Sequence, residues 1–228
     1  MLPIRDNVPG RTFPVVTVGL IAANAAVFIL YQLPHLDRSI VDYGFLPCRV
    51  DDTCPGVGSS WLVTAFTSMF LHGGWEHLLG NMLFLWIFGN NVEDAMGRVR
   101  FLGFYVIAGL AATTTQTAVT MLAASTDAER IPSVGASGAI AGVLGAYFVL
   151  LPRARVLVWS LFFLFEVPAV AFLGLWFLFQ LWSGGFSVLH PEQGGGVAFF
   201  AHIGGFAFGM LTVRLFTSGR ALTRDQYA

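Results

Sequence analysis

Four polar residues in otherwise apolar stretches have the types and spacing of a hydrolytic site. Ser137 stands in VGASGAIAGVLGAYFVLL and His202 in FFAHIGGFAFG, while HGGWEHLLGN holds His77 and Asn81 four positions apart, on one face of a helix. A serine hydroxyl becomes a nucleophile when a histidine nitrogen lies about 2.6 to 3.2 Å away and takes its proton. Because polar side chains are costly inside a membrane, all four are candidates for a functional site.

The overall composition indicates that these residues belong to a membrane protein. Of the 228 residues, 56% are hydrophobic and only 11% are charged, which is far from the balance of a soluble domain. A helix needs about 20 mainly apolar residues to cross about 30 Å of hydrocarbon. The apolar stretches predict an all-α membrane protein, a six-helix bundle over residues 13–217 with short ends at 1–12 and 218–228. The six predicted spans are 13–32, 74–92, 101–124, 134–151, 168–182 and 197–216.

The fifth predicted span lies within a longer apolar run. The apolar run over 156–182 is too long for one untilted span, and it contains Glu166 and Pro168. Proline suits the first turn of a helix and an acid is stabilised at the positive end, so the span is expected to begin at Pro168. Residues 156–167 are then expected to lie at the membrane surface.

The 12 basic residues are all arginines, and they divide unevenly between the two sides of the predicted bundle. Nine share the side of the two termini: Arg5, Arg11, Arg98, Arg100, Arg153, Arg155, Arg214, Arg220 and Arg224. The opposite loops hold only Arg38, Arg49 and Arg130. By the positive-inside rule both termini are predicted to be cytoplasmic, and we expect a multi-pass protein of the cell (plasma) membrane. A cleaved signal peptide is the alternative for the first span, although its apolar run continues past the small residues at 22–26.

The predicted topology brings the four polar candidates to one depth. Spans two, four and six all start on the external side, and each candidate lies within the first turn or two of its span. Gly138 and Gly142 on the fourth span, and Ala201, Gly205 and Gly209 on the sixth, form small-xxx-small faces that let two backbones approach closely. We therefore expect the serine of one helix to contact the histidine of the other beneath the external surface.

The two cysteines, Cys48 and Cys54, both lie in the first external loop. In an oxidising compartment they could form a disulfide, and two free thiols are equally compatible with the sequence. A zinc site would need further ligands that this loop does not offer. No metal or other cofactor is expected.

The motifs around the polar residues resemble those of the rhomboid intramembrane serine proteases. The likeness includes GASG around Ser137, the spacing of His77 and Asn81, AHIGGFAFG around His202 and GNNVEDAMG over 89–97. It extends across all six predicted spans. The resemblance implies that Ser137 is the nucleophile and His202 the general base, without an acid to complete a triad.

The same resemblance implies an oxyanion hole made by the side chains of His77 and Asn81 and the backbone N–H of Ser137. Gly135 and Gly138 would keep the surroundings of the serine open for a peptide. The implied partners are the lipid bilayer and transmembrane protein substrates, cut in or near their transmembrane segments close to the external face. Nucleic acid is not expected, and the sequence leaves the oligomeric state open.

Two positions depart from the family's pattern. Many members have tryptophan followed by arginine in the first external loop, whereas Trp61 is followed by Leu62. Some members have an aromatic residue four positions after the serine, packed on the catalytic histidine, where this chain has Ala141. Phe206, one turn after His202, is the candidate to orient the ring instead.

Other features have plainer interpretations. The glycine-rich segment 183–197 is predicted to be a flexible cap over the site, with a simple linker as the alternative. Asn24, Gln116 and Gln180 are interpreted as amides satisfied by neighbouring helices.

A transporter and an inactive relative are the alternative functions. A transporter predicts polar residues through both halves of the membrane, and an inactive relative predicts loss of the serine or the histidine. The sequence shows neither, so hydrolysis is the prediction.

Overall fold

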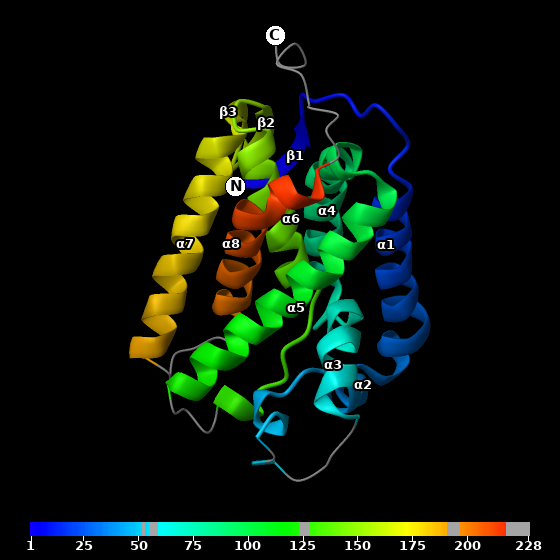
Figure 1. The fold of residues 1–228 in the computed structure, drawn as a ribbon, viewed down its shortest axis with the longest axis vertical. Coiled ribbons are helices and arrows are strands. Elements are labelled where there is room, and N and C mark those ends of the chain that lie inside the picture. Colours follow the sequence, from blue (N-terminus) through cyan, green and yellow to red (C-terminus); the bar gives the residue numbers. More distant parts are fainter. Residues whose placement is uncertain (52, 55–58, 124–127, 191–196, 218–228) are drawn as a thin grey trace.

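A bundle of helices runs along the molecule, with a small sheet at one end (Figure 1). The structure, a computed structural model, describes residues 1–51, 53–54, 59–123, 128–190 and 197–217. The helices are α1 (Val15–Ala26), α2 (Leu36–Tyr43), α3 (Trp61–Thr67), α4 (Trp75–Met96), α5 (Arg98–Leu122), α6 (Ser137–Leu150), α7 (Ala169–Leu189) and α8 (Phe199–Phe216). The strands are β1 (Leu2–Asp6), β2 (Arg155–Ser160) and β3 (Phe163–Pro168).

Within the described residues, four helical segments are long and apolar enough to cross a membrane. They are Val15–Tyr43, in which a π-helical and a 3-10 turn join α1 to α2, together with Arg98–Leu122, Ala169–Leu189 and Phe199–Phe216. The predicted spans 74–92 and 134–151 correspond to α4 and α6, which are not among them. Helix α4 carries acids near both ends, and α6 has only 14 residues. Membrane-spanning helices are thus present, and six crossings remain a prediction.

Helix α6 is enclosed by the rest of the bundle. Every residue from Gly138 to Tyr147 is buried, and the helix packs against α4, α5, α7 and α8. A helix surrounded by protein does not have to match the thickness of the hydrocarbon by itself, so its short length is compatible with a membrane fold. Its first residue is Ser137, which therefore starts a central helix rather than a peripheral one.

The close approach of α6 to α5 and α8 depends on residues with small side chains or none. A Cβ added to Gly205 of α8 would overlap the carbonyl oxygen of Gly138, and one added to Gly209 would overlap that of Gly142. On the other side of α6, a Cβ on Gly138 would lie 2.6 Å from the Cβ of Ala112 in α5. The small-xxx-small faces therefore bring the backbones of α6 and α8 into van der Waals contact.

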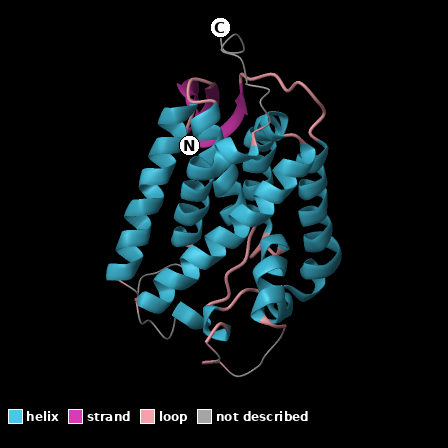
Figure 2. Cartoon of the chain, in the orientation of Figure 1, coloured by secondary structure: helices cyan, strands magenta, loops and turns pink. Residues whose placement is uncertain are grey.

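An antiparallel three-stranded sheet, in the order β1-β2-β3, is the main departure from the all-α prediction (Figure 2). The N-terminal end 1–12 contributes β1, and residues 156–167 form most of β2 and β3. Val156 and Val158 are fully buried while Trp159 is half exposed. This two-residue period in a segment of β-branched and aromatic residues is typical of a strand. The all-α prediction is wrong here because the high content of apolar residues conceals such a period.

Helix α7 extends beyond the predicted fifth span of 168–182. Pro168 is its N-cap, as the sequence predicts, but the helix continues through Leu189. Part of the predicted cap over 183–197 is therefore helical. The buried Gly184 packs against the first turn of α8, which gives that glycine a structural use within the helix. Residues 191–196 of the predicted cap, and the predicted tail at 218–228, lie outside the described residues.

Two acidic side chains fix the end of the bundle that carries the sheet. Glu93 of α4 accepts hydrogen bonds from two N–H groups in the first turn of α1, at 2.8 and 3.0 Å, and so satisfies donors that lack partners within that helix. Asp6, at the end of β1, accepts hydrogen bonds from Asn91 Nδ2 at 2.7 Å and from the Tyr147 hydroxyl at 2.5 Å. Burial raises the pKa of Asp6, and these hydrogen bonds oppose the shift. Asp6 thereby joins β1 to α4 and α6.

A disulfide and a buried arginine fix the loop between α2 and α3. Cys48 and Cys54 are joined, with their Cα atoms 5.5 Å apart, which decides the alternative that the sequence leaves open. The Arg49 guanidinium is buried and donates to two backbone carbonyl groups, including that of Ser59 at 3.0 Å. This loop thus has a buried arginine of its own, although Leu62 stands where many family members have one.

Candidate active site

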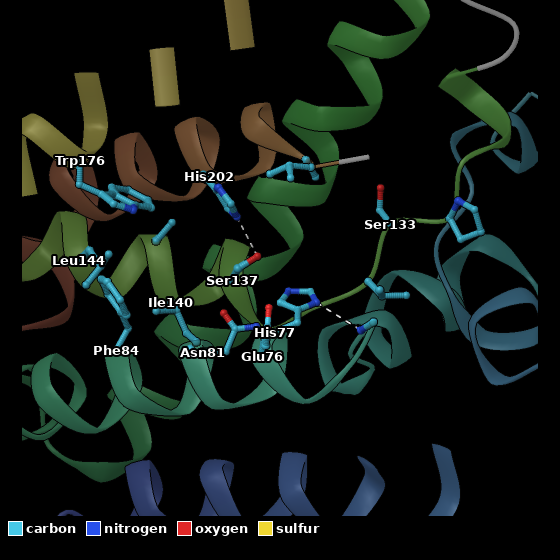
Figure 3. A pocket seen from close by; sticks show the side chains of 17 residues that line it. Glu76, His77, Asn81, Phe84, Ser133, Ser137, Ile140, Leu144, Trp176 and His202 are labelled. Carbon is cyan, nitrogen blue, oxygen red and sulfur yellow. Dashed lines mark hydrogen bonds between the residues drawn. The ribbon is translucent and has the colours of Figure 1, made fainter. Parts of the chain in front are cut away.

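Ser137 and His202 lie on different helices and meet between them (Figure 3). The distance from Ser137 Oγ to His202 Nε2 is 2.9 Å. Ser137 is the first residue of α6 and His202 lies in the first turn of α8, so the glycine-mediated packing of these helices places the two side chains together. The distance lies within the range of about 2.6 to 3.2 Å in which a base can take a proton. The pair has the geometry of a nucleophile and its general base.

Two side chains of α4 lie on the other side of the serine from His202 (Figure 3). Asn81 is only 8% exposed, and its Nδ2 has no hydrogen-bond partner among the described residues. The Nδ1 of His77 accepts the N–H of Gly73 at 3.2 Å, so the proton of the neutral ring is on Nε2. The N–H of Ser137 adds a third donor, because the first N–H groups of a helix have no intrahelical acceptor. The three groups could donate hydrogen bonds to a negatively charged oxygen placed between them.

Gly135 separates His77 from Ser137. Its φ of +125° is a conformation that side-chain-bearing residues rarely adopt. A Cβ at this position would also lie 2.8 Å from His77 Nε2 and 3.6 Å from Ser137 Oγ. Both the backbone conformation and the space in front of the imidazole therefore require glycine. The absent side chain leaves the donors accessible to a peptide carbonyl.

A cavity of about 470 Å³ lies beside these side chains. His77, Asn81, Ser137 and His202 all line it. Much of the remaining lining is apolar and comes from α4, α6, α7 and the approach to α8: Phe84, Ile140, Leu144, Trp176 and Val197. Such a lining suits an apolar side chain held close to a few polar groups. Within the part of the chain that the structure describes, no cluster of three or more His, Cys, Asp or Glu side chains could hold a metal ion.

The Rhomboid domain model matches residues 59–219, which include all four polar candidates and the helices that carry them. The chain belongs to the rhomboid family. The resemblance seen in the sequence motifs is thereby confirmed, and this rhomboid is a membrane protein of a family whose members are generally intramembrane serine proteases.

Curated relatives of this rhomboid come from fungi, animals and plants. It is 32% identical over 195 residues to Rhomboid protein 1, mitochondrial, of Saccharomyces cerevisiae. The matched region covers 84% of this chain and 50% of the yeast protein. It is 29% identical over 198 residues to the human Presenilin-associated rhomboid-like protein, mitochondrial, covering 84% and 46% of the two chains. RHOMBOID-like protein 5 of Arabidopsis thaliana is 38% identical over 91 residues, covering 39% and 26%. The chain spans about half the length of the first two relatives.

The predicted location in the plasma membrane is contradicted by these comparisons. The yeast and human relatives are both named as mitochondrial proteins. The prediction is wrong because the distribution of arginines distinguishes the two sides of a membrane from each other and carries no information about which membrane it is. The arginines therefore distinguish only an arginine-rich side from an arginine-poor side.

Helix α7 gives this rhomboid two contacts to His202 that the sequence did not predict. Gln180 Oε1 lies 2.9 Å from His202 Nδ1, and the ring centroids of Trp176 and His202 are 5.8 Å apart. Trp176 thus supplies an aromatic ring beside the histidine, whereas Phe206, predicted for that role, stacks on Phe177 at 4.5 Å. The one sequence feature that could have indicated these contacts is an amide, Gln180, four residues after Trp176 in an otherwise apolar span.

Proposed function

We propose that this rhomboid is an intramembrane serine endopeptidase that hydrolyses peptide bonds in or near the transmembrane segments of membrane proteins. The observation that carries the proposal is the 2.9 Å distance between Ser137 Oγ and His202 Nε2 in a bundle with membrane-spanning helices. Family membership supports the same class of reaction. The cavity beside the pair provides room for a substrate side chain.

In the proposed reaction, His202 Nε2 takes the proton of the Ser137 hydroxyl while Oγ attacks the peptide carbonyl carbon. The new C–O bond leaves negative charge on the carbonyl oxygen, which accepts hydrogen bonds from Asn81 Nδ2, His77 Nε2–H and the N–H of Ser137. His202 then gives its proton to the leaving amine as the C–N bond breaks. Water attacks the resulting ester by the same route, with His202 again as base, and restores the serine.

We further propose that α1, α4, α5, α6, α7 and α8 supply six crossings, with both termini on the arginine-rich side. The N-terminal strand packs with β2, which follows α6, so the end of α6 and the N-terminus lie on one side of the bundle (Figure 1). Ser137 is at the other end of α6. The site would then open toward the arginine-poor side, where water can reach it, and cut transmembrane protein substrates near that face.

A fluorophosphonate probe tests the proposed nucleophile directly. In detergent or liposomes, we expect a covalent adduct on Ser137 and on no other serine, mapped by mass spectrometry of the digested protein. His202→Ala should remove the labelling, because the hydroxyl is a poor nucleophile without its base. Heat-unfolded protein provides the blank. An adduct on Ser133, which lines the same cavity, or labelling that persists in His202→Ala, would contradict the dyad.

Asn81→Ala tests the oxyanion hole. We expect kcat for a model transmembrane substrate to fall about a hundredfold, because a donor that acts on the developing charge is lost. The matched control is Asn24→Ala, which removes a buried amide from α1, where its Nδ2 donates to the Leu20 carbonyl. If the two variants lose activity equally, Asn81 has no special place in the reaction.

A further inference from the structure

The ring of His202 has a second polar partner besides the serine. Its Nδ1 lies 2.9 Å from Gln180 Oε1, while its Nε2 faces Ser137 Oγ at the same distance. Gln180 is 5% exposed, although its neighbours Leu178 and Trp182 on α7 are 61% and 75% exposed. The only amide of this apolar helix therefore turns inward, toward the histidine, while the residues around it face outward.

We propose that Gln180 is the positioning residue of the dyad: its side-chain oxygen accepts the Nδ1–H of His202 and thereby directs Nε2 toward Ser137 as a base. The inference rests on the proposed function. A neutral imidazole has one N–H and one basic nitrogen. For Nε2 to accept the serine proton, Nδ1 must carry the hydrogen, and a hydrogen on Nδ1 needs an acceptor opposite it. The Oε1 atom of Gln180 is in that position.

An amide suits this position in a membrane better than an acid. A carboxylate would stabilise the protonated imidazole more strongly, but it would be a buried charge whenever the histidine is neutral, which is costly in a nonpolar environment. An amide offers an acceptor without that charge. The third group of a triad both orients the histidine and stabilises the charge of its protonated form. Gln180 would do the first and contribute little to the second.

Helix α7 also places an aromatic ring beside His202. Trp176 lies one turn before Gln180, hence on the same side of α7, and its ring is tilted by 39° to that of His202. Ala141 and Trp176 both line the cavity, so the small residue on α6 leaves space that an aromatic from α7 borders. Both of these contacts to the imidazole thus come from α7, and Gln180 is the one that can select the tautomer.

The test compares Gln180→Leu, Gln180→Glu and the control Asn24→Leu, all in the full chain reconstituted in liposomes with a model transmembrane substrate. Gln180→Leu should lower kcat on the order of ten- to a hundredfold with KM unchanged, because the tautomer is no longer selected. Gln180→Glu keeps an acceptor and should cleave faster than Gln180→Leu. When the pH is lowered, the Gln180→Glu variant should also lose its activity at a higher pH than the parent does. A carboxylate beside the ring favours the protonated imidazole, which cannot act as the base. Asn24→Leu should match Gln180→Leu in thermal stability and keep the parent's rate.

A double variant separates positioning from mere packing. In the His202→Ala background, Gln180→Leu should cause no further loss of activity, because the group it positions is gone. Additional loss there, parental activity of Gln180→Leu, or a Gln180→Glu variant that behaves like Gln180→Leu would each overturn the proposal. These outcomes leave the proposed function intact as long as the parent cleaves and labels on Ser137. Absence of cleavage and labelling in the parent would instead overturn the function itself.

Discussion

Ser137→Ala, His202→Ala and the double variant are expected to cleave a model transmembrane substrate at one common residual rate, at least about a thousandfold below the parent. The two side chains act as a unit through the 2.9 Å contact, so removal of either should abolish the same step. The residual rate would come from the donors of α4 and α6, which remain in place. Cleavage is measured in liposomes from the appearance of the two substrate fragments.

Ser133→Ala is the control for this experiment, because Ser133 lines the same cavity. Its hydrogen bonds to Phe45 are made by its backbone, which the substitution leaves unchanged. This variant should keep the activity of the parent. If the double variant were much slower than both single variants, the serine and the histidine would act independently, and the dyad mechanism would be wrong.

Gly205→Val is expected to remove detectable cleavage and to lower the free energy of unfolding by about 3 kcal/mol. The new Cβ would overlap the carbonyl oxygen of Gly138, which is backbone and cannot rotate away. Helices α6 and α8 must then separate, and a displacement of about 1 Å at the reacting groups is enough to cost a large part of the rate. Unfolding in mixed micelles reports the stability, and fluorophosphonate labelling reports the state of Ser137.

Gly103→Val provides the comparison on α5, because no atom other than those of its chain neighbours and of the backbone of its own helix lies within 4 Å of the Cβ that it would gain. It should keep labelling and cleavage close to those of the parent. A Gly205→Val protein that remained as stable and as active as Gly103→Val would show that the packing of α6 on α8 does not set the geometry of the site.

The sequence predicts that four polar side chains lie close together, because each is a polar residue inside an apolar span, where burial costs free energy. They are Ser137, His202, His77 and Asn81. Alternation of the chain across a membrane brings every second span in from the same side, so residues near the starts of these spans share a depth. The glycine spacing then indicates which two helices touch. The roles of these side chains in the reaction are implied by the family resemblance and do not follow from their spacing.

The contribution of α7 could not be predicted in the same way. Hydropathy locates a span along the chain, but it does not fix the rotation of the helix about its axis, which packing against neighbours determines. Gln180 was therefore one of several amides without a distinguishing feature. The position of Trp176 beside His202 could not be predicted for the same reason, since an aromatic ring at the histidine can come from any adjacent helix.

The sheet escaped prediction for a different reason. Strand β2 alternates buried and exposed residues over a short segment, but its partner β1 lies at the other end of the sequence, so no local signal joins them. A run of apolar residues near a membrane is interpreted first as a span or a surface segment, and only the two-residue period distinguishes the strand.

The pairing of Leu2 with Trp159 has a consequence for biosynthesis. Strand β1 is synthesised before β2, which leaves the ribosome only after α6, so β1 cannot pair with β2 until α1 to α6 have been made. The carboxylate of Asp6, bound by Asn91 and Tyr147, would then dock only after α4 and α6 are in place. A change in β1 would therefore affect this pairing, whereas the insertion of α1 to α6 would proceed as before.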